Sequence, residues 1–182
     1  MRFEPVVLEA ERVRLRWIRA TDAGALFGWY SDPVMTRYLS LPPWTQASEA
    51  LKKIERTLEA YETGAHLNFI VEQVADAAPI GMAGLFHVHE TSRRAEIGYM
   101  LDRGYWGQGL MHEALVVLVA HAFSGLELNR LEADIDPRNV ASARSLERLG
   151  FHYEGLMRER WIVNGEVSDT AFYGLLRSEW KN

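Results

Sequence analysis

The chain contains no cysteine, so it can form no disulfide, no thiolate zinc site and no cysteine nucleophile. It also lacks long apolar runs, since no segment approaches the roughly 20 consecutive apolar residues that a membrane-spanning helix needs. Basic residues are not in excess: 20 Lys and Arg against 25 Asp and Glu leave a net charge of −5. We therefore expect neither a nucleic-acid nor a membrane partner, and the acidic balance mildly favours cationic substrates.

The composition that remains is typical of one soluble globular domain. The 182 residues are 48% hydrophobic and 25% charged, which is long and apolar enough for a substantial core. No internal repeat, low-complexity tract or linker divides the sequence, so we expect a single domain over residues 1–182. The segment 1–5 lacks the apolar core of a signal peptide, and we expect a cytoplasmic protein.

The first third of the chain predicts one strand and two helices. Residues 13–18 alternate like a half-buried strand. Asp22 is the expected cap of a first helix and Thr45 that of a second, in which apolar residues recur at helical spacing. Gly64 is the expected end of this second helix.

Strands then dominate. Residues 67–71, 80–86 and 95–101 are apolar runs with short polar connections, which predicts an antiparallel meander. A third helix is expected from residue 110 to about 125, and residues 131–135 alternate as a further strand.

A fourth helix is predicted from Asn139 to Leu149, with Val140 on its apolar stripe and Gly150 as its stop. Asn164-Gly165 then predicts a hairpin turn. Strands before, between and after helices indicate a mixed α+β sheet.

Two glycines, Gly107 and Gly109, lie where the third strand of the meander gives way to a helix. Glycines at such an entry let a phosphate approach the backbone, and the free N–H groups and positive end of the helix dipole bind it. The spacing is neither the G-x-G-x-x-G of a dinucleotide fold nor a P-loop. Taken alone, the turn is equally compatible with a tight connection that holds no ligand.

Motifs around this turn resemble those of the GNAT acyltransferases, especially the RimJ/RimL-like branch that acts on ribosomal protein N-termini. In order they are A-E-I-G-Y-M-L (95–101), W-G-Q-G-L-M-x-E-A (106–114), D-P-x-N-x-x-S (136–142) and L-G-F (149–151). The resemblance extends over residues 15–180. It implies an α+β fold with a mixed, mostly antiparallel central sheet flanked by about four helices.

The resemblance also implies acetyl-CoA as co-substrate, bound where two central parallel strands, 95–101 and 130–136, separate. Backbone N–H groups of residues 108–112 are expected to hold its pyrophosphate. The implied coenzyme-binding residues are Met100, Leu101, Trp106, Gly107, Gln108, Gly109, Leu110, Met111, His112 and Asn139. Two residues depart from the family motif Gln/Arg-x-x-Gly-x-Gly/Ala: Trp106 replaces Gln or Arg, and Met111 replaces a small residue.

Glu96 is the candidate general base. It lies in an apolar strand, where desolvation raises the pKa of a carboxyl, and the Ala-Glu-Ile triplet resembles the base-bearing segment of the histone-acetylating branch. The alternative is a surface glutamate that pairs with Arg93 or Arg94. Direct action and action through a water both remain open.

Ser142 is the candidate partner of the leaving thiol, because many GNAT enzymes use a tyrosine at the position that Leu146 occupies here, and the RimJ/RimL-like branch has a serine at 142. Its alternative is an ordinary serine in a helix first turn, and Tyr153 and Tyr173 are reserve donors. Asn139 is expected to cap the fourth helix and, by resemblance, to bind the pantetheine arm. The oxyanion donor is expected among the backbone N–H groups of residues 98–101.

Other polar and aromatic residues have mainly structural interpretations. His87 and His89 lack a third ligand, so no metal is expected. The cationic side chains on or near the fourth helix face either phosphates or solvent; they are Arg138, Arg144 and Arg148. Four aromatic residues of the N-terminal part either line an acceptor groove or pack the first two helices onto the sheet; they are Trp29, Tyr30, Tyr38 and Trp44.

These observations predict an acetyl-CoA-dependent N-acetyltransferase that acts on a primary amine, either a protein N-terminus or a small molecule. A peptide acceptor predicts an open groove beside the hairpin, whereas a small amine predicts an enclosed acidic pocket. Leu146 keeps a second hypothesis open, a catalytically silent acyl-CoA sensor. An unrelated nucleotide-binding domain is a third, and a homodimer is compatible with the sequence.

Overall fold

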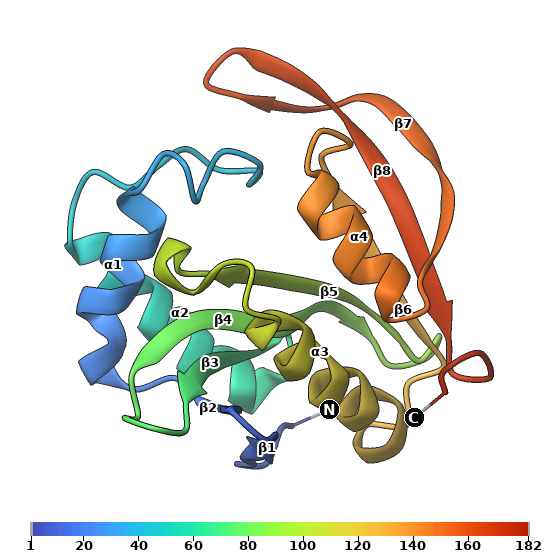
Figure 1. The fold of residues 1–182 in the computed structure, drawn as a ribbon, viewed down its shortest axis with the longest axis horizontal. Coiled ribbons are helices and arrows are strands. Elements are labelled where there is room, and N and C mark those ends of the chain that lie inside the picture. Colours follow the sequence, from blue (N-terminus) through green and yellow to red (C-terminus); the bar gives the residue numbers. More distant parts are fainter. Residues whose placement is uncertain (1, 182) are drawn as a thin grey trace.

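The computed structural model describes residues 2–181, which form one sheet with helices on both faces (Figure 1). The eight strands follow the order β1-β2-β3-β4-β5-β6-β8-β7. Their bounds are β1 Leu8–Glu9, β2 Val13–Trp17, β3 Leu67–Gln73, β4 Pro79–His89, β5 Arg94–Leu101, β6 Arg130–Ile135, β7 His152–Val163 and β8 Glu166–Leu176. The helices are α1 Ala23–Ser31, α2 Ser48–Thr63, α3 Leu110–Ala120 and α4 Val140–Arg148.

All neighbouring strands pair antiparallel except β5 and β6, which are parallel. The predicted mixed, mostly antiparallel sheet with four helices is thus confirmed. Among residues 2–181, no helix is long and apolar enough to cross a bilayer.

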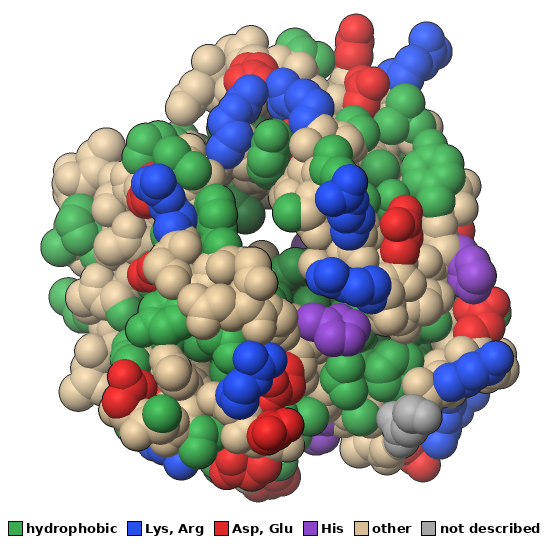
Figure 2. All heavy atoms as spheres, viewed as in Figure 1, with side chains coloured by type: hydrophobic (Ala, Val, Ile, Leu, Met, Phe, Trp, Pro, Cys, Tyr) green, Lys and Arg blue, Asp and Glu red, His purple; other side chains and the backbone are tan. Residues whose placement is uncertain are grey.

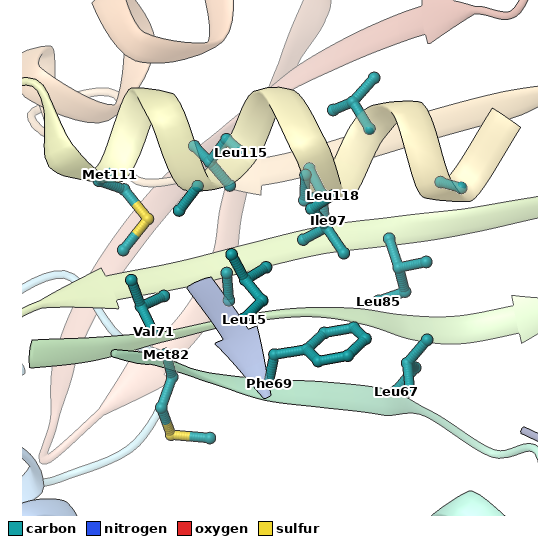
Figure 3. Packing of buried hydrophobic residues seen from close by; sticks show 14 of the residues in the cluster. Leu15, Leu67, Phe69, Val71, Met82, Leu85, Ile97, Met111, Leu115 and Leu118 are labelled. Atoms are coloured by element: carbon teal, nitrogen blue, oxygen red, sulfur yellow. The ribbon is translucent and has the colours of Figure 1, made fainter. Parts of the chain in front are cut away.

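Helix α3 packs on one face of the sheet. Figure 3 shows Met111, Leu115 and Leu118 pointing from α3 toward the sheet, where they meet Leu85 and Ile97. A helix with apolar residues on nearly every side belongs in such a buried place, and all five side chains are at least nine-tenths buried. The start of α3 is therefore held rigidly against the centre of the sheet.

Helices α1 and α2 cover the opposite face. Met82 points away from α3 in Figure 3, and the Tyr30 hydroxyl of α1 lies 4.0 Å from its sulfur. On α2, the Lys53 ammonium lies 5.9 Å from the ring centroid of Phe86 in β4. The sheet consequently separates an α3 side from an α1–α2 side.

The ends of the first two helices differ from the predictions. Asp22 precedes α1 but makes no capping hydrogen bond there, because its carboxylate binds the Arg16 guanidinium at 2.8 and 2.9 Å. Helix α2 begins at Ser48, after the expected cap Thr45, whose backbone N–H donates to Glu49. Gly64 ends α2 in the left-handed conformation, with φ of 75°, as predicted.

The C-terminal half follows the prediction closely. Asn139 caps α4 by accepting a hydrogen bond from the Ser142 N–H, and Gly150 ends the turn with φ of 90°. Asn164 and Gly165 both have positive φ, as a two-residue hairpin turn between β7 and β8 requires. Val140, expected on the apolar stripe, is 53% exposed, because the stripe reaches the core only one turn further along α4.

A buried ionic cluster ties β2 to β3 and α1. Arg16 lies between Asp22 and Glu72, and all three side chains are at least 94% buried. Burial alone raises the pKa of Glu72, but hydrogen bonds from Arg16 and Arg14 outweigh this effect and lower the pKa below its ordinary value.

Glu72 therefore contributes stability that is fully present above its unfolded pKa and is lost as pH falls through its lower folded pKa. We expect Glu72→Gln to lower the free energy of unfolding by about 1–3 kcal/mol at neutral pH, because a buried guanidinium loses one charged partner. The difference from the parent protein should shrink on acidification. Urea denaturation at neutral and acidic pH measures it, and a constant difference contradicts the assignment.

Candidate active site

The central parallel strands separate partway along their length. Strand β5 pairs with β6 only from Arg94 to Glu96, opposite Arg130 to Glu132. Beyond these residues, β5 continues to pair with β4 through Leu101 and β6 with β8 through Ile135. The two strands thus diverge just after Glu96, as expected from the motifs.

Figure 2 shows an opening through the molecule between the half that carries α1 and the half that carries α4. Lys and Arg side chains lie around this opening. An elongated ligand placed in it would reach both faces of the sheet.

On the α3 side, the loop after β5 presents backbone N–H groups. Gly107 and Gly109 adopt φ of 76° and 78°, which glycine reaches without strain. Within residues 2–181, the N–H groups of residues 107–112 have no hydrogen-bond acceptor. Helix α3 starts here, so its dipole adds positive potential.

Three contacts fix the position of this loop. Arg12 donates to the Gln108 carbonyl at 3.1 Å and to the Glu113 carboxylate at 2.8 Å. The Trp106 indole, half exposed, donates to the Leu101 carbonyl at 2.6 Å. Trp106 therefore joins the loop to the end of β5. Its indole N–H supplies a hydrogen-bond donor at a position where the family motif has Gln or Arg.

The other departure from the motif is also accommodated. Met111 is 9% exposed and its side chain points toward the sheet, so only its backbone N–H faces the loop. His112 has a buried Nδ1 without a partner among residues 2–181. Burial and the charge of Arg148 lower the pKa of His112.

Ser142 meets a residue that the sequence did not single out. The hydroxyls of Tyr99 and Ser142 lie 2.9 Å apart, and either can be the donor. Burial raises the pKa of Tyr99 to about 12, against a smaller opposing effect of the bond to Ser142. Tyr99 therefore keeps its proton at neutral pH. Its hydroxyl also lies 3.3 Å from the Ser142 carbonyl, and when that bond is not made the pair has one hydroxyl hydrogen to give to a third group.

Glu96 lies on the α1–α2 side of the strand separation. Its carboxylate is 2.9 Å from His87 Nδ1, and its side chain is 26% exposed. His87 reaches it because β4 is irregular between Phe86 and His89 and His87 itself has φ of 47°. Glu96 pairs with neither Arg93 nor Arg94, and Arg94 binds Glu132 instead.

A cavity of about 500 Å³ borders Glu96. Its walls come from the end of α1 and residues 33–43 of the loop after it, Lys53 of α2, Asn68 of β3, the centres of β4 and β5, the end of β6 and the β7–β8 hairpin. The loop and the hairpin are joined where Arg37 binds Glu166 at 3.1 Å. Acidic and basic side chains both line the cavity, so its charge does not single out either of the two acceptor sites expected.

Some candidates lie elsewhere. Arg138 binds Asp136 and Glu166, so it belongs to the cavity wall and leaves Arg144 and Arg148 as the exposed cations of α4. The reserve donors Tyr153 and Tyr173 contact each other edge to face, and neither borders the cavity. Among residues 2–181, no group of His, Asp and Glu suits a metal ion.

The aromatic residues of α1 and of the loop that follows it divide between the two expected roles. Tyr30 and Tyr38 line the cavity. Trp44 stacks on Tyr30 with ring centroids 4.3 Å apart, and Trp29 is buried and donates to Asp102. The tyrosines thus border the site while the tryptophans pack behind them.

Comparison with known proteins identifies the family. Residues 12–152 match the family model of the acetyltransferase (GNAT) domain. The chain belongs to the GNAT family. It is an N-acetyltransferase, and the RimJ/RimL-like resemblance predicted from the motifs is confirmed by the relatives of this GNAT protein.

Among the curated relatives, the uncharacterised N-acetyltransferase p20 of Bacillus licheniformis is 34% identical over 173 residues, 95% of this chain and 97% of the relative. The ribosomal protein uS5-alanine N-acetyltransferase of Escherichia coli (strain K12) is 25% identical over 184 residues, 96% of this chain and 93% of the relative. The solved structure of RimL, a ribosomal L7/L12 alpha-N-protein acetyltransferase in complex with coenzyme A, has a TM-score of 0.83. At 20% identity, over 94% of this chain and 98% of that one, it shows the shared fold.

Proposed function

We propose that this GNAT protein, acting as a single domain, transfers the acetyl group of acetyl-CoA directly to a primary amine. The observation that carries the proposal is the separation of β5 from β6 immediately after Glu96, because it joins a phosphate-binding loop on one face to a cavity on the other. The amine belongs to a protein N-terminus or a small molecule. The ribosomal-protein acetyltransferases among the relatives favour the N-terminus.

The residues present fit the coenzyme. The unpaired N–H groups of residues 107–112 suit a pyrophosphate, as backbone N–H groups at a helix N-terminus do generally. Along the strand, Met100 and Leu101 border the separation, where the pantetheine arm would lie. Asn139 uses its Oδ1 to cap α4, so its Nδ2 is free to donate to an amide oxygen of that arm.

Glu96 is proposed to accept the proton that the amine must lose. Acetyl-CoA supplies a thioester, whose carbonyl carbon bonds to the amine nitrogen as the carbon–sulfur bond breaks. His87 holds the Glu96 carboxylate in place through Nδ1, and the exposure of both side chains allows transfer directly or through one water. A backbone N–H between Gly98 and Leu101 is proposed to donate to the carbonyl oxygen as its charge grows.

Tyr99 and Ser142 are proposed to stabilise the departing thiolate together. Because the pKa of Tyr99 is raised to about 12, it is a poor proton donor to a thiolate, whose conjugate acid is far stronger. The hydroxyl pair instead donates a hydrogen bond, and the sulfur takes its proton from water on release. Leu146 is fully buried, so the residue at the family's tyrosine position serves the core, and Tyr99 approaches the thiol side from β5.

We expect Tyr99→Phe to lower kcat about tenfold, the loss of one hydrogen bond to a developing charge, with the KM for acetyl-CoA little changed. Ser142→Ala should have a similar effect. Because the two hydroxyls act as one unit, the double variant should be scarcely slower than either single variant. Steady-state kinetics measures all three, and fully additive effects contradict joint action.

The function itself is tested by mixing the protein with acetyl-CoA and a panel of primary amines, including peptides with free N-termini. We expect release of free thiol that depends on the amine, together with a product whose mass is that of the acetylated amine. Coenzyme binding without turnover across a broad panel would instead identify an acyl-CoA sensor.

A further inference from the structure

One wall of the cavity that borders Glu96 is formed by α2 and β3, and it carries two polar side chains that the chemistry above does not use. Lys53 lies on α2 and Asn68 on β3, and both line the cavity. The Lys53 ammonium is 5.9 Å from the ring centroid of Phe86. Phe86 is the direct cross-strand neighbour of Glu96, so one aromatic side chain separates Lys53 from the proposed base.

Lys53 is a cation without an anionic partner among residues 2–181. Among residues 2–181, the favourable contact of its ammonium is with the Phe86 ring. Burial lowers the pKa of Lys53, and the nearby positive charge of Arg56 lowers it further. An anion in the cavity would relieve both effects.

Most of the other charged side chains of the cavity wall are held in ion pairs. Arg37 and Arg138 share Glu166, and Arg138 also binds Asp136. Asp134 binds Arg160, and Glu96 faces His87. Of the Lys and Arg side chains that line the cavity, within the described residues, Lys53 is thus the one without an ion pair.

Asn68 adds an independent observation. It is 1% exposed, its Nδ2 is buried without a hydrogen-bond partner, and no residue between 2 and 181 bonds its side-chain amide. The amide lies across Gly84 of β4, where a Cβ would collide with Asn68 Oδ1. Buried polar groups are nearly always paired, so this amide indicates a partner that enters the cavity from outside.

We propose that Lys53 and Asn68 form a subsite for a carboxylate that the acceptor carries near its reacting amine. The proposal rests on the proposed function, because it takes Glu96 as the place where the amine reacts. The ammonium and the amide each donate to one carboxylate, and a single unpaired cation matches its single negative charge. A phosphate group would call for more donors, typically an arginine fork. The carboxylate belongs to an acidic peptide N-terminus or to a free amino acid.

Binding is tested by calorimetry on the CoA-saturated protein with matched pairs of acceptors. The dipeptide amides Ala-Asp and Ala-Asn represent the peptide source, and γ-aminobutyrate and its amide represent the small source. We expect the carboxylate member of at least one pair to bind about tenfold tighter or more, as for a hydrogen-bonded charge. The pair with the larger ratio identifies the source, and equal binding within both pairs overturns the proposal.

Substitutions at Lys53 test whether this side chain causes the preference for a carboxylate. Lys53→Met keeps the length and helix propensity of the side chain but removes the charge, so the carboxylate preference should disappear while amide binding stays unchanged. Lys53→Arg is the matched control that should retain the preference. If Lys53→Met weakens both members of a pair equally, Lys53 is only structural and the proposal fails.

Asn68→Leu removes the unpaired amide at similar volume. We expect weaker carboxylate binding together with a higher melting temperature of the free protein, since an unsatisfied buried amide destabilises it. A lower melting temperature with unchanged carboxylate binding contradicts the role of Asn68. Turnover is followed separately. Carboxylate-selective binding without thiol release supports the subsite and contradicts the acetyltransferase assignment of the site. Thiol release without carboxylate selectivity supports that assignment and contradicts the subsite.

Discussion

Glu96→Gln is expected to lower kcat by about 10²- to 10⁴-fold at neutral pH, the range that a positioned general base contributes. The amide has the shape of the carboxylate and can keep an oxygen at the place where Glu96 faces His87, so binding of both substrates should persist. It cannot take a proton. The reaction would then depend on the small fraction of amine that is already neutral.

The rate of the Glu96→Gln enzyme should therefore depend on pH in a predictable direction. Since a free alkyl amine has a pKa near 10 and an α-amine one near 8, the Glu96→Gln rate should climb with pH as the amine loses its proton by itself. The deficit relative to the parent enzyme should narrow at alkaline pH. Initial rates of thiol release over this range, at saturating coenzyme, measure it.

His87→Gln is the matched control, because it removes the ring that holds the carboxylate but leaves the base in place. We expect a loss of kcat no greater than about tenfold, the worth of one orienting polar contact. A Glu96→Gln enzyme with the full parental rate at every pH removes Glu96 from the mechanism. Acetyl transfer would then use another base, or the enzyme would bind only the amine molecules that are already neutral in solution.

The second large effect is expected at the phosphate-binding loop. Gly109 has φ of 78°, and a side chain in this left-handed region costs roughly 1–2 kcal/mol, with the β-branched Val among the worst choices. The loop carrying Gly109→Val would either keep this strain or turn its N–H groups away from the ligand. We expect the Kd for coenzyme A to rise roughly 10- to 100-fold.

Gly104→Ala provides the comparison within the same loop. The nearest atom to a Cβ at Gly104 is Asp102 Oδ1 at 3.4 Å, an ordinary contact, and the backbone of Gly104 is not left-handed. Its affinity should stay within about twofold of the parent, since no strain or lost contact is involved. Calorimetric titration with coenzyme A, alongside thermal unfolding, measures both variants. Unchanged affinity in a folded Gly109→Val protein means that the pyrophosphate does not lie on this loop.

Local sequence signals succeeded where neighbouring residues alone decide the conformation. The glycine turn at 107–109, the Asn139 cap and the Asn164-Gly165 hairpin all appear as predicted. Each depends on backbone sterics or on a hydrogen bond that spans a few residues. The predicted caps at Asp22 and Thr45 were wrong. Arg16 of β2 binds the carboxylate of Asp22, and helix α2 starts three residues beyond Thr45.

Local sequence patterns could not predict which side chains of the site contact each other. Tyr99 and Ser142 are 43 residues apart in the chain, so no local pattern pairs them. His87 faces Glu96 only because an irregularity in β4 turns it aside. A signal was available for Tyr99, three residues after Glu96 and so on the opposite face of the same strand. Lys53 and Asn68 had no comparable signal.

The sequence by itself determined the family, the order of helices and strands, and the place of the glycine-rich loop, because these follow from patterns among close neighbours along the chain. Tertiary structure alone decided which side chains meet across the separated strands and which charges remain unpaired in the cavity. An ion pair such as Arg37 with Glu166 joins residues 129 positions apart. Its partner is chosen by how the sheet is folded, and Coulomb energy acts over a few ångströms of space, whatever the distance along the chain.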